Sequence, residues 1–94
     1  MSNFFSGEYK NGQNNGKVEI YYKNGLLAFS GEYRDGKRNG IGKEYYPNGK
    51  LKYSGEYLND QWNGKGIEYF KNGKAKCDGE YLNGNEIKNE INIK

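Results

Sequence analysis

Apolar and polar residues alternate along this chain in short runs, and polar turns that contain Asn-Gly separate many of the runs. Alternation with a period of two is typical of a β-strand that buries one face. Asn-Gly between such runs is a strong hairpin signal, because both central residues of a type I′ turn need positive φ. The predicted strands lie near residues 3–9, 16–22, 26–33, 40–46, 50–57, 64–70 and 74–81.

The pattern is an internal repeat. Ser-Gly-Glu-Tyr begins at residues 6, 30 and 54, and Asp-Gly-Glu-Tyr begins at residue 78, so the period is 24 residues. Self-similarity at a fixed period indicates a repeat architecture. We divide the single domain of residues 1–94 into repeats 6–29, 30–53 and 54–77, a half repeat 78–85 and a tail 86–94.

Each repeat contains two connections, a two-residue Asn-Gly turn and a longer polar loop of about six residues, such as residues 34–39. The tight turn puts Tyr46 opposite Leu51, and the loop puts Tyr33 opposite Gly40. Both closures assign the same residues to the same face, a consistency that a wrong register would lose. We therefore predict an all-β fold, an open single-layer antiparallel meander of about seven strands built from 24-residue β-hairpin repeats.

One face of this meander collects rings and glycines. A ring beside a glycine can lie over bare backbone and bury a large area, so a ladder of rings can replace a second layer. The expected rows are Tyr9, Gly16, Tyr33, Gly40, Tyr57, Gly64 and Tyr81, and beside them Gly7, Val18, Gly31, Gly42, Gly55, Gly66 and Gly79.

The spacing of these residues resembles the MORN repeat, whose pattern is aromatic-x-Gly-x-aromatic-x-x-Gly-x-x-His-Gly-x-Gly. The second repeat carries it in Phe29, Gly31, Tyr33, Gly36, Gly40 and Gly42. Asn39 and Asn63 stand where histidine is usual, and Asp60 takes the place of the loop glycine. The Tyr-Tyr-x-Asn-Gly ending looks like a bacterial variant of the repeat, found in proteins labelled antitoxin components. The resemblance implies a non-catalytic array that binds protein or phospholipid.

The composition offers little catalytic chemistry. The chain has no histidine and one cysteine, Cys77, so we expect no metal, no cofactor and no enzymatic activity. Glu44 and Glu68 share the ring face, and paired carboxylates could perform acid–base chemistry. The alternative is that they accept hydrogen bonds from tyrosine hydroxyls. We favour the alternative, because Ile20 occupies the same position in the first repeat.

Two surfaces are candidates for binding a partner. On the opposite face, tyrosine and lysine alternate, which suits nucleic acid or an acidic protein patch, although lysine stems over rings could simply keep the sheet soluble. The loops of the second and third repeats depart from the repeated sequence. The architecture does not require a tryptophan at Trp62, so this residue either contacts a partner or folds back onto the sheet. The candidate residues are Trp62, Arg34, Lys37 and Arg38 in the loops, and Tyr45, Lys52 and Tyr69 on the face.

We expect the partner to be another protein, which this chain would block as a small inhibitor, antitoxin or immunity protein. A phospholipid-surface adaptor and a nucleic-acid binder are the alternatives, and unpaired strand edges could also form a homodimer. The net charge of +3 permits an acidic partner without arguing for one. Residues 1–5 show no signal peptide, so we expect a cytoplasmic protein. Ile87, Ile91 and Ile93 in the tail could cover the last edge.

Overall fold

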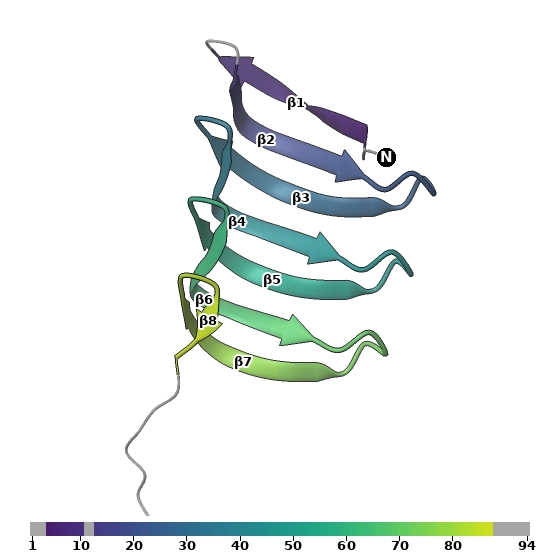
Figure 1. Ribbon diagram of the computed structural model, residues 1–94, viewed down its shortest axis with the longest axis vertical. Helices are drawn as coiled ribbons and strands as arrows, with labels where there is room; N and C mark the ends of the chain where they lie inside the picture. Colours follow the sequence, from purple (N-terminus) through teal and green to yellow (C-terminus); the bar gives the residue numbers. More distant parts are fainter. Residues whose placement is uncertain (1–3, 11–12, 88–94) are drawn as a thin grey trace, which may run out of the picture.

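The computed structural model describes residues 4–10 and 13–87, with side chains described from Asn15 to Ile87. Its regular elements are strands that form one antiparallel sheet in chain order (Figure 1). They are β1 (Phe4–Lys10), β2 (Gln13–Tyr21), β3 (Leu27–Arg34), β4 (Lys37–Tyr45), β5 (Leu51–Leu58), β6 (Gln61–Tyr69), β7 (Ala75–Leu82) and β8 (Asn85–Glu86). The predicted open all-β meander is confirmed, and the seven predicted strands have ends that differ by at most three residues.

The connections predicted as six-residue loops are two-residue turns, and that prediction was wrong. Arg34 pairs directly with Lys37. The two residues between them, Asp35 and Gly36, both have positive φ, at 53° and 82°. Two consecutive residues of this kind form the type I′ turn whose twist matches that of the flanking strands. The same turn recurs at Asn59-Asp60 and Asn83-Gly84.

The tighter turn changes the pairing at one end of each hairpin. Gly31 pairs with Gly42 as predicted, but Tyr33 pairs with Arg38 rather than with Gly40. The register shifts between these two pairs, which marks a β-bulge. β4 therefore begins three residues before the predicted start, and residues expected in a loop belong to a strand.

The Asn-Gly turns are also different from the prediction. Only their glycines have positive φ, so they are not type I′ turns; these glycines are Gly25, Gly49 and Gly73. The Gly49 N–H donates to the Tyr46 carbonyl at 2.9 Å, and the Tyr46 N–H donates to the Lys50 carbonyl at 2.8 Å. A three-residue connection that ends on a left-handed glycine has this pattern.

Two asparagines of the Asn-Gly turns, Asn24 and Asn48, link neighbouring repeats. The Lys50 N–H donates to Asn48 Oδ1 at 2.8 Å, which closes the turn. Asn48 Nδ2 donates in turn to the Lys71 carbonyl in the following repeat, at 3.1 Å. Asn24 makes the same link to the Pro47 carbonyl at 3.0 Å. The asparagine side chain thus caps its own turn and ties it to the next one.

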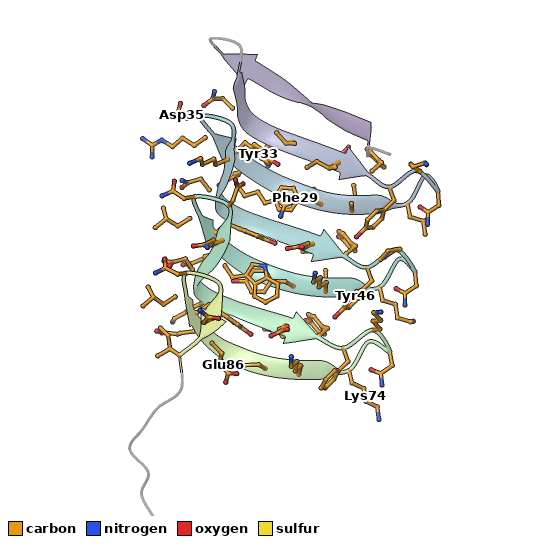
Figure 2. All side chains as sticks on the ribbon, in the orientation of Figure 1. Phe29, Tyr33, Asp35, Tyr46, Lys74 and Glu86 are labelled. Atoms are coloured by element: carbon orange, nitrogen blue, oxygen red, sulfur yellow. The ribbon has the colours of Figure 1, made fainter. Side chains whose placement is uncertain are left out.

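The buried side chains form a ladder of rings on the face that the bent strands enclose, where Phe29 is drawn in Figure 2. Successive rings meet edge to face, with centroids between 5.3 and 5.9 Å apart, a favourable geometry for aromatic pairs. In order along the ladder, the rings are Tyr33, Phe29, Tyr57, Tyr53 and Tyr81. The predicted ring ladder is confirmed, and Val18 and Ile20 extend the same buried cluster towards β1.

Paired glycines let these rings approach the backbone. A Cβ added at Gly42 would lie 2.9 Å from the ring of Phe29, and a Cβ added at Gly66 would lie 2.4 Å from Tyr53 Cζ. Both distances are too short for real atoms, so only glycine fits beneath the rings. The rings therefore stand in for the second layer that a single sheet otherwise needs.

Candidate partner-binding surface

Trp62 lies flat on Tyr53 instead of standing at the rim of the sheet. The two ring centroids are 4.3 Å apart and the ring planes differ by 4°. Tyr53 is fully buried, whereas Trp62 is half-buried and pairs across the β5–β6 hairpin with Tyr57. Of the two sequence interpretations of Trp62, the structure supports the one in which it folds back. Its first role is to cover the ring ladder.

Arg38 has the equivalent position in the preceding repeat and also covers the ring ladder. Its guanidinium carbon lies 4.4 Å above the centroid of the Phe29 ring and 5.9 Å from that of Tyr57. A guanidinium over a ring face is a cation–π contact, and it also shields the ring from water. Of the four loop candidates, Trp62 and Arg38 thus pack on the ladder, while Arg34 and Lys37 remain exposed.

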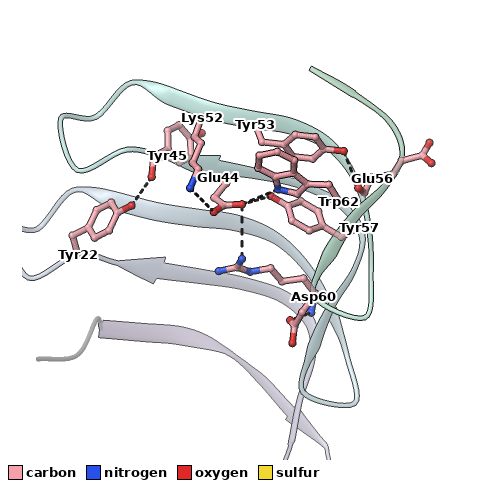
Figure 3. Close-up of polar contacts among 10 residues, drawn as sticks. Tyr22, Glu44, Tyr45, Lys52, Tyr53, Glu56, Tyr57, Asp60 and Trp62 are labelled. Atoms are coloured by element: carbon pink, nitrogen blue, oxygen red, sulfur yellow. Dashed lines mark hydrogen bonds and ion pairs between the residues drawn. The ribbon is translucent and has the colours of Figure 1, made fainter. Parts of the chain in front are cut away.

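Glu44 is the polar centre of this packed layer (Figure 3). Its Oε1 accepts hydrogen bonds from the Tyr57 hydroxyl at 3.0 Å and from Trp62 Nε1 at 3.1 Å. Arg38 Nη1 lies 3.8 Å from the same oxygen, and Lys52 Nζ lies 3.7 Å from Oε2. The carboxylate therefore has donors or cations on four sides, all of them side chains of the packed layer. This confirms the hydrogen-bonding interpretation of Glu44.

Burial and the nearby carboxylate both make the ring hydroxyls reluctant to ionise. Desolvation, followed by the charge and hydrogen bond of Glu44, raises the pKa of Tyr57 far above its ordinary value. Desolvation raises the pKa of Tyr53 to about 12. Desolvation is also the main cause that raises the pKa of Tyr81. All three hydroxyls are therefore protonated near neutral pH, and each donates a hydrogen bond, Tyr57 to Glu44 Oε1, Tyr53 to the Glu56 carbonyl and Tyr81 to the Cys77 carbonyl.

Alkaline titration should reveal these three tyrosines. Because their pKa is higher in the folded than in the unfolded state, their contribution to stability is complete below about pH 10 and is lost as the pH rises further. For Tyr53, this loss occurs between about pH 10 and about pH 12. We expect absorbance at 295 nm to show a late group of tyrosines that ionise together with loss of the circular dichroism spectrum. In urea, all tyrosines should ionise near pH 10. A single transition near pH 10 in the native protein would contradict this.

The prediction that Lys52 lies on the face opposite the rings was wrong, because Lys52 lies on the ring face. The β4–β5 register shifts beside it, because Glu44 pairs with Tyr53 and Tyr45 pairs with Leu51. Lys52 is the extra residue of this bulge, and a bulge re-aims a side chain. Its ammonium therefore meets Glu44 and lies 5.8 Å from the Tyr46 ring. Lys76 repeats the arrangement with Glu68, at 3.4 Å.

The type I′ hairpins form an exposed edge, which we call the hairpin edge and define by residues 34–37, 58–61 and 82–85. Arg34, Asp35, Lys37, Asn39, Leu58 and Asn59 line a shallow hollow of about 630 Å³ there. Leu58 is 46% exposed and Leu82, one repeat further on, is 54% exposed. The edge thus presents Arg34 and Lys37 of one repeat beside Leu58 of the next.

Hydrogen bonds between repeats hold the hairpin edge rigid. The Asp60 N–H donates to the Arg38 carbonyl at 2.9 Å, and Asp60 Oδ1 accepts from the Arg38 N–H at 2.8 Å. The Gly84 N–H makes the same bond to the Trp62 carbonyl at 2.8 Å. Loops held in this way lose little conformational entropy on binding, which favours recognition.

Tyr45 and Tyr69 lie on the face opposite the rings. Tyr45 borders an open hollow of about 500 Å³ whose lining mixes charges of both signs, including Lys17, Glu32 and Lys43. The predicted tyrosine and lysine alternation is broken here, because Lys52 and Lys76 bind Glu44 and Glu68 on the other face. Among the described residues, the predicted row of tyrosines and lysines on this face therefore lacks Lys52 and Lys76.

Within the described residues, the acidic and cysteine side chains form no group of three that could hold a metal ion. The same residues contain no helix long and apolar enough to cross a membrane. Glu44 is fully engaged by donors that belong to the ladder, and Glu68 binds Lys76. The described carboxylates on the ring face are thus structural in their contacts.

Sequence reasoning missed the exposed leucines of the hairpin edge. Leu58 and Leu82 follow the shared Gly-Glu-Tyr, where the second repeat has Arg34. They depart from the repeat as clearly as Trp62 does. That departure was the available signal, but leucine is such a common core residue that it did not suggest a surface role.

Comparison with known families gives one result. A family model described as the MORN repeat matches three consecutive segments, residues 5–26, 29–50 and 53–75, which together make up well over half of the chain. A search of curated proteins finds no match. Two of the matched segments contain a described ring over paired glycines, Phe29 in one and Tyr53 in the other.

Proposed function

Because the chain belongs to the MORN repeat family, we propose that it is a non-catalytic module whose ligand is another protein. The finer proposal is that it blocks that protein, as a small inhibitor, antitoxin or immunity protein does. Two observations support the proposal. The ring face uses its polar groups internally, whereas the hairpin edge offers exposed side chains on a rigid frame.

The observation that carries the proposal is the composition of the hairpin edge. Arg34 and Lys37 are exposed beside Leu58, and Leu82 continues the apolar row. Protein interfaces combine an apolar centre with a polar rim, and arginine is enriched among the residues that dominate affinity. A partner of matching chemistry has an apolar patch bordered by carboxylates.

The test begins with affinity purification of a stoichiometric complex, followed by its reconstitution from two purified proteins. We expect Arg34→Glu with Lys37→Glu to weaken this complex by about 2 kcal/mol or more, because both charges then repel the acidic rim. Leu58→Ser should weaken it through the apolar centre. Lys23→Glu, an exposed change at the opposite edge, is the matched control and should leave the affinity unchanged.

The rival functions give different results in parallel assays. Sedimentation with vesicles that contain anionic lipid would favour a membrane-surface adaptor. Oligonucleotide binding whose affinity falls steeply with salt would favour a nucleic-acid binder. If the reconstituted complex tolerates the charge reversals and Leu58→Ser but is lost with Tyr45→Ala, the opposite face and not the hairpin edge is the binding surface.

A further inference from the structure

The outer edge of β7 has no strand partner over most of its length in the described part of the chain. β8 pairs only with Tyr81 and Leu82, and the Ile87 N–H adds a bond to the Glu80 carbonyl at 2.8 Å. Backbone polar groups alternate in direction along an antiparallel strand. Because the Glu80 carbonyl points outwards, the N–H and C=O of Asp78 point outwards as well. An unpaired edge of this kind can accept a further strand.

The ring layer is incomplete at this edge. At the β3–β4 and β5–β6 junctions, Phe29 and Tyr53 fill the space above the paired glycines. Cys77 occupies the equivalent position in β7, and a Cβ added at Gly79 would meet only Cys77 Sγ, at 3.9 Å. Glu86 in β8 stands where Arg38 and Trp62 cover the rings in the earlier repeats, and Figure 2 shows it beside β7. The space above Gly79 can therefore hold a bulky side chain.

The charge of this edge is also distinct. Asp78, Glu80 and Glu86 are all exposed. Ser30 takes the place of Asp78 in β3, and the residue opposite Ser30 in β4 is Lys43. A carboxylate in place of the serine would attract a basic side chain more strongly, because opposite charges directly across two strands stabilise the pair.

We propose that the outer edge of β7 is a strand-addition site for an extended segment of a partner protein. The segment places a bulky apolar side chain opposite Gly79 and a basic side chain opposite Asp78. Main-chain hydrogen bonds to Asp78 supply affinity, and the two side chains supply specificity, as in other cases of β-augmentation. This inference rests on the proposed protein-binding function, and it names a second contact surface for the partner.

A second copy of the chain is a poorer occupant than a partner segment. Each junction of the sheet joins a strand that contains Gly-Glu-Tyr to a strand that does not. Both β1 and β7 contain Gly-Glu-Tyr. Pairing the β7 edge of one copy with the β1 edge of another would therefore create a junction that occurs nowhere in the sheet. A strand of a partner protein can lack Gly-Glu-Tyr and so form the kind of junction that the sheet contains.

The probe is a fluorescent peptide with the sequence of residues 40–46 that carries Gly42→Phe. In the register of the β3–β4 junction, this peptide sets phenylalanine opposite Gly79 and Lys43 opposite Asp78. We expect saturable binding to the full chain by fluorescence anisotropy. The same peptide with Lys43→Glu, or with Gly42 restored, should bind about tenfold more weakly or worse, because it lacks one of the two contacts.

Two variants of the full chain locate the site. Asp78→Pro removes the outward N–H and should abolish peptide binding, and proline is tolerated where an edge N–H faces solvent. Asp78→Lys keeps the N–H and should weaken binding by about tenfold or more through charge repulsion. Glu19→Lys, a charge reversal on the same sheet face at β2, is the control and should bind as the unaltered chain does. Circular dichroism confirms that each variant is folded.

Three results would overturn the proposal. These are no saturable binding by the full chain, equal binding by the Asp78→Pro variant, and a homodimer in solution that Asp78→Pro dissociates. A failure of strand addition can be distinguished from a failure of the proposed protein-binding function. If the reconstituted partner complex is unaffected by Asp78→Pro but is lost when Arg34 and Lys37 are reversed, protein binding stands and strand addition is wrong.

Discussion

Truncation of Tyr57 to alanine should lower the free energy of unfolding by about 3–5 kcal/mol, the usual range for removing a large buried aromatic side chain. Tyr57 is 4% exposed and meets Phe29 and Tyr53 edge to face, at 5.4 and 5.3 Å. Its loss opens a cavity in the middle of the ladder. It also removes a hydrogen-bond donor from Glu44, whose remaining partners must then satisfy a partly buried charge.

Urea denaturation followed by circular dichroism measures this loss, provided that the m-value of the variant matches that of the unaltered chain. Tyr45→Ala is the matched control, because Tyr45 is a half-buried tyrosine on the opposite face. We expect the control to cost about 1 kcal/mol or less. If Tyr57→Ala also costs less than about 1 kcal/mol, the ring ladder is not the core of this protein.

Two glycines in the same row should respond oppositely to alanine. An added Cβ at Gly66 would lie 2.2 Å from the Tyr53 hydroxyl oxygen and 2.4 Å from Cζ, so the ring must move and disturb its stack with Trp62. We expect Gly66→Ala to cost about 2 kcal/mol or more, the range for overpacking a tight core. Gly79→Ala meets only Cys77 Sγ at 3.9 Å, and it should be neutral or stabilising by less than about 1 kcal/mol.

Thermal denaturation of the two single variants suffices for this comparison. A melting temperature that falls for Gly66→Ala and is maintained for Gly79→Ala matches the expected order. Equal losses would mean that both glycines are required for backbone flexibility rather than for the space beneath a ring. The two positions are occupied by the same residue type on adjacent strands, so the comparison isolates the ring.

The sequence predicts the sheet and its ring face well, because their causes are local and repeated. Gly31 recurs with the same spacing in each copy, and Phe29 and Gly42 have the equivalents Tyr53 and Gly66 in the third repeat. Period-two alternation sets the face of these residues without any knowledge of the third dimension. The register across Gly31 and Gly42 was therefore correct. Such features are shared by several copies, and each of these copies is a check on the others.

The turns could not be predicted as well, because their local sequences are ambiguous. Asn48-Gly49 and Asp35-Gly36 are both good type I′ sequences. Only the second forms that turn, whereas Asn48 accepts the Lys50 N–H with its side chain, as Asn24 and Asn72 do in the sister turns. The Asn-Gly dipeptide alone therefore does not decide between the two turns, because the asparagine side chain can close a different turn on itself.

The candidate site suffered from the same limitation. The sequence identified Trp62 and Arg38 as departures from the repeat. It did not predict that they would lie on Tyr53 and Phe29, since that depends on how the strands bend. Lys52 was assigned to the wrong face because a bulge reverses the direction of a side chain. Arg34 and Lys37 are exposed as a loop prediction implies, although the loop itself is a tight turn.

The central claim is that rings over paired glycines replace a second layer and so leave the hairpin edge free for a partner. A double-mutant cycle on Tyr53 and Gly66 tests it most directly. Tyr53→Cys places at β5 the residue that β7 has at the equivalent position, Cys77, beside which an added Cβ at Gly79 has room.

The measurement is the free energy of unfolding of Tyr53→Cys, Gly66→Ala and the double variant. We predict that Gly66→Ala, which costs about 2 kcal/mol or more alone, costs less than about 0.5 kcal/mol in the Tyr53→Cys background, because the ring it would strike is gone. Costs that add within about 0.5 kcal/mol would show that the ring and the glycine act independently, and would contradict the claim.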